Sequence, residues 1–273
     1  MAQYGDDCRA YAGGTELLLL MKLGLVTSPH LVDLKGLALD NVADNARHLS
    51  IGACTTYAAL ARSSIVVRHG WQVLASAAGD VGNVRVRSVG TIGGNLCFAD
   101  PSSDIGTVLL LADARLELLS REGPRTVPLD LFLVGALTTA LRPGELLLRI
   151  AIPAPANRGV AVYRRVAVGE RPTAGFACRL ERGDDGRISA ARIVVGAAHP
   201  HPLRLAEAEA VLSGVSSSGA EAREAVDHVA ALAAAACEPI GDVHATVAYK
   251  RRLVSVLARR ALVDTMTKLA SDD

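Results

Sequence analysis

Apolar residues in the first half of the chain fall into short alternating runs and helix-like runs, separated by loops rich in glycine. Alternation with a period of two predicts strands, and apolar positions spaced three and four apart predict helices. Strands are expected at residues 30–34, 48–52, 115–119 and 145–152, after a short apolar stretch that ends at Tyr11. Helices are expected within residues 12–25 and at residues 57–61, 65–78 and 102–111.

Threonines precede two of these helices and are candidate N-caps, because a hydroxyl oxygen can accept a hydrogen bond from a free N–H of the first turn. Thr15 is the candidate cap of the first helix, and Thr55 or Thr56 that of the helix over residues 57–61. Residues 79–94 form a passage punctuated by glycines. We expect specialised loops there.

A segment rich in proline, AIPAPANRG at residues 151–159, separates this half from a different pattern. Because prolines interrupt regular structure, we place a domain boundary near residue 156, between domains of residues 1–156 and 157–273. Antiparallel strands are expected at residues 159–166, 173–182 and 188–197, with a tight turn at Gly183-Asp184-Asp185-Gly186 between the last two. Helices are expected at residues 203–212, 220–236 and 246–269. Strands followed by helices are typical of an α+β fold.

Composition argues against several classes of partner. The 273 residues include 29 Lys and Arg against 28 Asp and Glu, and no long basic run provides a footprint for nucleic acid. The longest apolar runs, Leu17–Met21 and Ala230–Cys237, are much shorter than the roughly 18 residues of a membrane span. No secretory signal is visible at the start of the chain. We therefore expect a cytoplasmic protein that binds neither nucleic acid nor membrane.

Metal binding and covalent catalysis are not indicated either. The five cysteines are scattered without a CxxC pair, and His199-Pro200-His201 lacks a third ligand. No Ser-His-Asp order is evident, so we expect no catalytic residue and no metal on this chain. The basic residues between Lys250 and Arg260 are expected to form the solvated face of an amphipathic helix.

Two double-glycine loops are the most informative features of the sequence. The first is Ala12-Gly13-Gly14-Thr15-Glu16 and the second is Thr91-Ile92-Gly93-Gly94-Asn95. Neither is a GxGxxG or Walker loop, and either one alone is most often a tight turn. Glycine also lets backbone N–H groups approach a pyrophosphate, so the two loops are compatible with a dinucleotide site. A bulky side chain at Gly93 or Gly94 is then expected to occupy the pyrophosphate's place.

The order and context of these loops identify a family. AGGTELLLLMKLGL, HLVDL and VRVRSVGTIGGNLCFADPSSDIGTVLLLADARLEL together resemble the FAD-binding medium subunit of the molybdenum hydroxylases. This family includes the carbon monoxide dehydrogenase medium subunit and the xanthine dehydrogenase FAD domain. YRRVAVG, VGAAHPHPLRLAEAEAVLSG and DVHATVAYKRRLVSVLARRAL resemble the C-terminal domain of the same flavoproteins. The resemblance therefore covers nearly the whole chain.

The resemblance implies a PCMH-type, vanillyl-alcohol-oxidase-like FAD domain in two parts, followed by a C-terminal domain of three antiparallel strands and three helices. By this resemblance the two glycine loops hold the FAD pyrophosphate from two sides. Asp104, nine positions after Asn95, binds the ribose and adenine end, and Leu141 contacts the flavin. By itself Asp104 also suits a helix N-terminus, where the helix dipole stabilises an acid.

The resemblance also implies the function and the partners. A molybdenum-binding large subunit oxidises the substrate, and a small subunit with two [2Fe-2S] clusters passes electrons to the FAD of this chain. The electrons then leave to NAD, a quinone or oxygen. The complex is expected to be a heterotrimer that forms dimers.

Two alternatives stay open. A free-standing FAD oxidase of the same superfamily would need a substrate-binding set of acid, base and aromatic residues, and none is evident beyond the FAD loops. A binding module that kept the fold but lost the cofactor is disfavoured by the intact glycines of both loops.

Family members also have roughly two dozen residues, the scale of part of a βαβ unit, before the GDD segment that begins at Gly5. We therefore expect an FAD domain that is short at its N-terminus.

Overall fold

The computed structural model describes residues 3–45, 47–155, 159–243 and 245–271. The chain forms two compact units, one of Met1–Asp100 with Ala112–Ala154 and the other of Pro101–Leu111 with Pro155–Asp273. Residue 156, near which we predicted the domain boundary, lies outside the described residues, so that boundary stays a prediction. The pattern of the sequence gave no sign that Pro101–Leu111 groups with the second unit.

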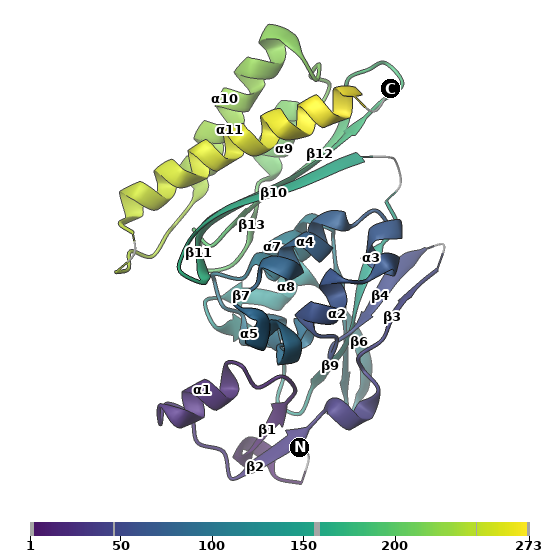
Figure 1. Ribbon diagram of the computed structural model, residues 1–273, viewed down its shortest axis with the longest axis vertical. Helices are drawn as coiled ribbons and strands as arrows, with labels where there is room; N and C mark the ends of the chain where they lie inside the picture. Colours follow the sequence, from purple (N-terminus) through teal and green to yellow (C-terminus); the bar gives the residue numbers. More distant parts are fainter. Residues whose placement is uncertain (1–2, 46, 156–158, 244, 272–273) are drawn as a thin grey trace. The chain divides into compact units, whose positions relative to one another are not determined.

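A five-stranded antiparallel sheet organises the first unit (Figure 1). Its order is β3 (Val42–Asp44), β4 (His48–Gly52), β9 (Leu146–Pro153), β5 (Arg115–Ser120) and β6 (Gly123–Pro128). Alternate residues of β4, β5 and β9 are fully buried, which is the expected result of period-two alternation against a core. They are Leu49, Ile51, Leu116, Leu118, Ile150 and Ile152.

Short helices pack beside this sheet, namely α2 (Tyr57–Ala61), α3 (Ser64–Arg68), α4 (Gln72–Asp80), α5 (Val84–Val89) and α6 (Ile92–Phe98). Thr56 caps α2, because its side chain accepts from the Ala59 N–H as predicted. The single helix predicted for residues 65–78 is wrong. Gly70 adopts a φ of +86°, which ends α3 and lets the chain restart as α4.

The N-terminal part of this unit carries the first glycine loop. Strands β1 (Cys8–Tyr11) and β2 (His30–Asp33) pair in parallel, and α1 (Leu17–Lys22) lies between them in sequence. Glu16, not the predicted Thr15, is the N-cap of α1, and it makes no capping hydrogen bond through its side chain. The unit also contains α8 (Leu129–Phe132) and a small hairpin of β7 (Leu133–Gly135) and β8 (Thr138–Thr139).

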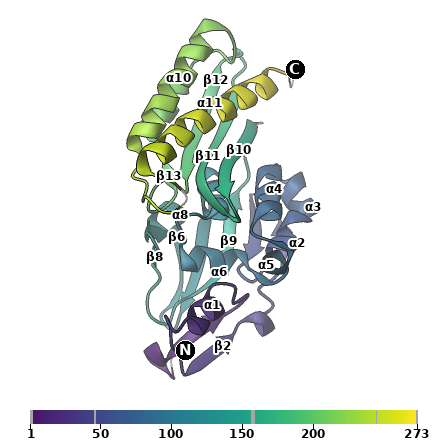
Figure 2. The same cartoon turned by 60° about the vertical axis from the view of Figure 1, so that its left-hand side comes forward.

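The second unit contains the predicted antiparallel sheet and, after it in the chain, the three predicted helices. Its strands are β10 (Gly159–Val168), β11 (Arg171–Arg182), β12 (Ile188–Gly196) and a two-residue β13 (Leu203–Arg204) that the sequence pattern did not reveal. The helices are α9 (Ala206–Leu212), α10 (Gly219–Ala236) and α11 (Val247–Ser271). Figure 2 shows α11 along β10 and β11. The described residues therefore form the α+β arrangement expected of this half of the chain.

Strand β11 is buried on both faces, so a further element must cover the face that α9–α11 leave open. Ala174, Phe176 and Cys178 belong to the core shared with those helices. Helix α7 (Asp104–Leu111), whose residues are all buried, packs on β11 and β12, and Figure 1 shows it on the opposite side of the sheet from α10 and α11. This packing explains why a helix from the middle of the chain belongs to the second unit.

A buried carboxylate anchors α7 to the sheet. The Tyr163 hydroxyl donates a hydrogen bond to Asp104, and Arg165 Nη1 lies 3.2 Å from Asp104 Oδ2. The side chain of Asp104 is only 3% exposed. A buried carboxylate is tolerated when it is paired and hydrogen-bonded, and these two partners from β10 meet that requirement.

The basic residues of α11 do more than form the predicted solvated face. Lys250 is buried, and its Nζ donates to Ile240 O at 2.9 Å and to Asp242 Oδ2 at 2.6 Å. Arg251 donates to Cys237 O, which lies just past the end of α10.

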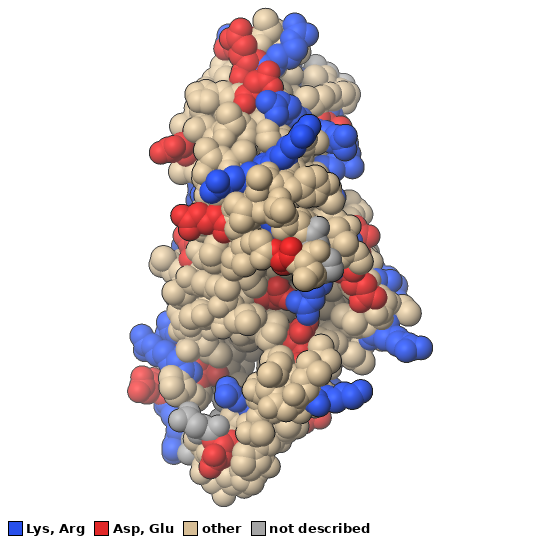
Figure 3. All heavy atoms as spheres, turned by 90° about the vertical axis from the view of Figure 1, so that its left-hand side faces the viewer, with Lys and Arg blue, Asp and Glu red and all other residues tan. Residues whose placement is uncertain are grey.

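On the face drawn in Figure 3, basic and acidic side chains are interspersed. No helix among the described residues has the length and apolar character needed to cross a membrane.

Changing Asp104 to Ala is expected to lower the free energy of unfolding of the second unit by about 3 kcal/mol, because Arg165 would lose its buried partner. Thermal unfolding and hydrogen exchange in β10–β12 measure this loss. Asp227→Ala is a suitable control, since Asp227 pairs with Arg259 on the surface and such pairs contribute under about 1 kcal/mol. Equal stability of the two variants would contradict the anchoring role of Asp104.

Candidate functional site

A cavity of about 1000 Å³ lies within the first unit, and both glycine loops line it. This volume is at the upper end of the range of roughly 300–1000 Å³ for small-molecule and cofactor sites. Most of the site residues expected from the sequence line it, namely Ala12, Gly13, Gly14, Thr15, Glu16, Thr91, Gly93, Gly94, Asn95 and Leu141. Ile92 is fully buried and does not line the cavity, and Asp104 belongs to the second unit.

The first loop lies against the residues that precede the second loop. A Cβ built on Gly13 would lie 2.2 Å from Val89 O and 2.8 Å from Gly90 Cα, so no side chain fits there. Gly14 has a φ of +71°, in the left-handed region that favours glycine. The chain's own packing therefore requires both glycines.

The backbone donors of the first loop are available to a ligand. Within the part of the chain that the structure describes, the N–H groups of Gly13, Gly14 and Thr15 donate to no other residue. All three residues line the cavity and are partly exposed. Several backbone N–H groups in one glycine loop suit an anion such as a pyrophosphate.

The second loop uses its donors within the chain. Ile92 N–H donates to Thr55 O, Gly93 N–H to Ala53 O at 2.9 Å, and Gly94 N–H to the Thr91 side chain at 3.1 Å. A Cβ on Gly93 would lie 2.6 Å from both Ala53 Cβ and Ala53 O. Gly93 is thus required for packing against Ala53, which differs from the role that the sequence suggested.

Gly94 has a different environment. It is exposed, it lines the cavity, and a Cβ built on it would approach only Thr91 Oγ1, at 2.9 Å. Among the described residues, no other atom outside the loop's own neighbouring backbone lies within 4 Å of that Cβ. Of the two glycines, Gly94 is therefore the one where an added side chain would compete with a ligand.

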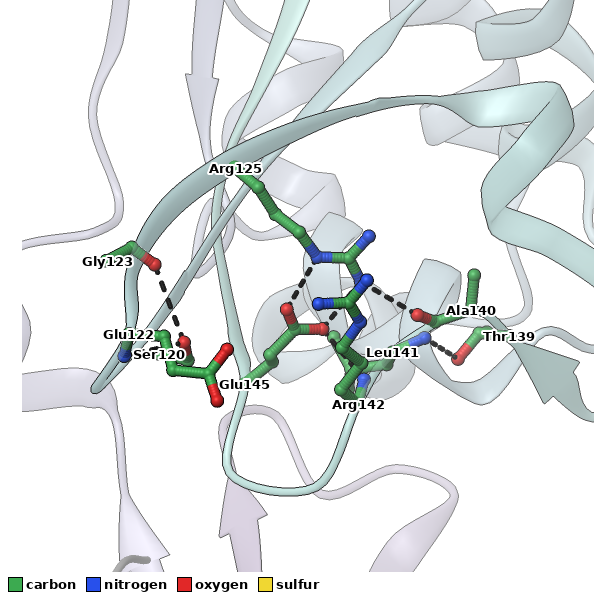
Figure 4. Close-up of polar contacts among 9 residues, drawn as sticks. All are labelled: Ser120, Glu122, Gly123, Arg125, Thr139, Ala140, Leu141, Arg142 and Glu145. Atoms are coloured by element: carbon green, nitrogen blue, oxygen red, sulfur yellow. Dashed lines mark hydrogen bonds and ion pairs between the residues drawn. The ribbon is translucent and has the colours of Figure 1, made fainter.

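Another wall of the cavity is formed by the turn at Ser120–Glu122 and by residues 141–147, the segment that carries Leu141. Figure 4 shows Arg125 of β6 reaching the buried carboxylate of Glu145, which belongs to this segment. Arg125 Nε lies 2.6 Å from Glu145 Oε1, and Arg125 Nη2 lies 2.7 Å from Oε2. Sequence reasoning missed this pair, although Pro143-Gly144 before Glu145 marked a turn.

Three titratable groups on the cavity wall have shifted pKa values. The hydrogen bonds from Arg125 hold the pKa of Glu145 below its ordinary range, and its bond from the Arg142 backbone acts in the same direction. Burial raises the pKa of the Cys97 thiol to about 12, and burial together with Asp40 and Asp33 raises that of Cys54. Both thiols are therefore protonated at neutral pH and are poor nucleophiles.

The remaining candidate residues lie outside this cavity. The Asp104 carboxylate is already bound by Tyr163 and Arg165, so its expected contact with the ribose and adenine stays a prediction. The rings of His199 and His201 meet edge to face with centroids 5.1 Å apart. Among the described residues, no group of three His, Cys, Asp or Glu side chains is placed to hold a metal ion.

Two family matches account for most of the chain. Residues 1–155 match the family described as the FAD binding domain in molybdopterin dehydrogenase. Residues 164–265 match the CO dehydrogenase flavoprotein C-terminal domain.

Individual proteins are similar over nearly the same extent. The carbon monoxide dehydrogenase medium chain of Afipia carboxidovorans is 31% identical over 265 residues, covering 96% of this chain and 90% of that protein. The xanthine dehydrogenase FAD-binding subunit of Escherichia coli O157:H7 is 32% identical over 213 residues, covering 74% and 71%. A solved structure of carbon monoxide dehydrogenase from Hydrogenophaga pseudoflava, which lacks the Mo-pyranopterin moiety of the molybdenum cofactor, has a chain that matches with a TM-score of 0.91 and 32% identity. The match covers 98% of this chain and 92% of that chain.

Substitutions at the two glycines of the second loop are expected to affect different properties, namely stability at Gly93 and FAD binding at Gly94. Gly93→Ala should lower the free energy of unfolding by about 1–3 kcal/mol, because the added Cβ meets Ala53. Gly94→Leu should cost less stability than Gly93→Ala, because its Cβ meets only the Thr91 hydroxyl, but should prevent FAD binding, since its side chain enters the cavity. Thermal unfolding and flavin fluorescence measure the two effects. A stable Gly93→Ala variant, or stoichiometric FAD in Gly94→Leu, would contradict this division.

Glu145→Gln is expected to destabilise the first unit by about 1.5–3 kcal/mol at neutral pH, through loss of charged hydrogen bonds. Because the pKa of Glu145 lies below its ordinary value of 4.5, its stabilising contribution is fully present above that pH. The contribution is lost as the pH falls through the lowered pKa. Hydrogen exchange in β6 and β9 should therefore show a constant difference between variant and wild type down to about pH 5, and a smaller one below. A difference that persists unchanged in strong acid would refute the assignment.

Proposed function

We propose, from the premise that this chain belongs to the family of FAD-binding subunits of molybdopterin dehydrogenases, that it is the electron-transfer subunit of a molybdenum hydroxylase complex. The observation that carries this proposal is the cavity lined by both glycine loops in a chain that matches the family's two domains in order. The chain's part in the reaction is to hold FAD and pass electrons through it.

The residues of the cavity fit FAD. The backbone donors of Gly13, Gly14 and Thr15 suit the pyrophosphate, because a glycine loop with several N–H groups favours an anion. In the second loop, Gly94 is exposed and leaves space for the cofactor, and Asn95 also lines the cavity. Leu141 supplies an apolar contact suited to a flavin ring. Asp104 is retained as the proposed contact of the ribose and adenine end.

When bound, FAD supplies chemistry that accepts electrons one at a time and delivers them in pairs. The chain's own residues bind the cofactor, orient it and limit the access of water to it. Burial keeps Cys54 and Cys97 protonated, and Glu145 is committed to Arg125, so these groups are not poised to exchange protons with a substrate. We therefore assign no general acid or base to this chain.

The proposed partners follow from the relatives. A molybdenum-binding large subunit would oxidise the substrate, and a small subunit with two [2Fe-2S] clusters would deliver electrons to this chain. Relatives named for carbon monoxide and for xanthine share the same flavoprotein domains, which supports substrate selection on a different subunit. NAD, a quinone or oxygen would then take the electrons. A dimer of heterotrimers in the cytoplasm stays a prediction.

The free-standing oxidase receives no support from the relatives named above. They are a medium chain, an FAD-binding subunit and a chain of a carbon monoxide dehydrogenase. A module without a cofactor is also disfavoured, since the first loop keeps backbone donors available and the cavity is large. Both alternatives predict that the chain purifies without molybdenum and iron partners.

Purification of the tagged chain from its native host tests the proposal. We expect a complex of three polypeptides with flavin absorbance, iron and molybdenum. A yellow protein without partners would favour the free-standing oxidase. A colourless protein that binds no added FAD would overturn the proposal.

A further inference from the structure

Hydrogen bonds hold the backbone on both sides of Leu141, and one of them comes from strand β6 of the sheet. On one side, Arg125 Nη2 donates to Ala140 O at 2.9 Å. On the other side, Arg142 N–H donates to Glu145 Oε2 at 2.7 Å. Leu141 N–H itself donates to the Thr139 hydroxyl at 3.3 Å. The backbone on either side of Leu141 is therefore fixed by hydrogen bonds (Figure 4).

The same segment closes into a tight turn. Glu145 N–H donates to Arg142 O at 3.0 Å, and Gly144 has a φ of +78°. With Pro143 before this glycine, the residues suit a type II turn, in which proline takes the second position and glycine the third. The turn brings the Glu145 carboxylate back to the Arg142 N–H and into reach of Arg125.

The Arg125–Glu145 pair differs from a typical surface ion pair. The side chain of Glu145 is 4% exposed and that of Arg125 is 28% exposed. Two parallel hydrogen bonds join the guanidinium to the carboxylate, which fixes direction as well as distance. Arg125 comes from β6, so the pair links the turn to a strand of the five-stranded sheet.

We propose that Arg125 and Glu145 are positioning residues that hold Leu141 against the FAD, and so adjust the affinity and the electronic environment of the flavin. This inference rests on the proposed function, since it requires FAD in the cavity. Leu141, Arg142, Pro143, Gly144 and Glu145 all line that cavity. Arg125 does not line it and acts through the segment that it holds.

The alternative is that the pair stabilises the fold and has no influence on the cofactor. A purely structural role predicts loss of stability with an unchanged flavin spectrum in the folded fraction. A positioning role predicts a changed flavin signal that depends on Leu141. A double-mutant cycle separates these cases, because coupled residues give non-additive effects.

The experiment uses the full chain loaded with FAD and compares the wild type with Arg125→Met, Leu141→Ala and the double variant. The measured quantities are the FAD dissociation constant, the visible spectrum of the bound flavin and its midpoint potential. Arg149→Met is the matched control, since Arg149 lies on β9, donates to Asn41 at 3.1 Å and does not line the cavity. Glu145→Gln also removes the ion pair between Arg125 and Glu145 and replaces Arg125→Met in the comparison if that variant does not fold.

We expect Arg125→Met to raise the FAD dissociation constant about tenfold and to shift the flavin spectrum and potential. Arg125→Met should add little to these changes in the Leu141→Ala background, and Arg149→Met should match the wild type. Arg125→Lys should retain only part of the wild-type affinity for FAD, because lysine cannot form two parallel hydrogen bonds to one carboxylate.

Additive effects of the two substitutions, or an unchanged flavin signal in both Arg125→Met and Glu145→Gln, would overturn the inference. Failure of the wild-type chain to bind FAD would instead overturn the proposed function. The two failures are thus distinguishable in the same set of measurements.

Discussion

Two backbone contacts that leave no room for a side chain determine the cavity. Gly13 lies against Val89 and Gly90, and Gly93 lies against Ala53. The first contact joins the first glycine loop to the residues just before the second loop, although the two loops are separated by about 80 residues in the sequence. The second contact fixes the second loop beside the residues that follow β4. The cavity wall therefore depends on close packing of backbone on backbone.

These contacts divide the work of the two loops. The N–H groups of the second loop donate hydrogen bonds to Ala53, Thr55 and Thr91, and these bonds fix the loop as a wall of the cavity. The first loop keeps the N–H groups of Gly13, Gly14 and Thr15 available among the described residues. Similar glycine pairs thus have different physical roles, one in holding the wall and one in presenting donors to an anion.

Two buried carboxylates also link structural elements of this chain. Asp104 is held by Tyr163 and Arg165 in the second unit, and Glu145 is held by Arg125 in the first. In both places an acid that would be costly to bury alone becomes a link between elements. Such committed acids suit a subunit that holds a cofactor and leaves substrate chemistry to a partner.

The sequence by itself determined the local features of this protein. Alternation marked β4, Thr56 was a candidate start of α2, and the two glycine loops with their flanking segments indicated the cofactor, because each of these signals depends on neighbouring residues. The break at Gly70 and the cap at Glu16 were missed, since a glycine is compatible with a helix or its end and threonine is the better N-cap by residue type.

Only the tertiary structure decided which distant residues meet. It placed α7 on the open face of β11, paired Arg125 with Glu145, and assigned Gly93 to packing against Ala53. These choices depend on contacts between residues that are far apart in the chain, and many pairings of equal chemical quality are compatible with the same local pattern. Burial then selects the partners, because an unpaired charge or an added Cβ inside the fold is costly.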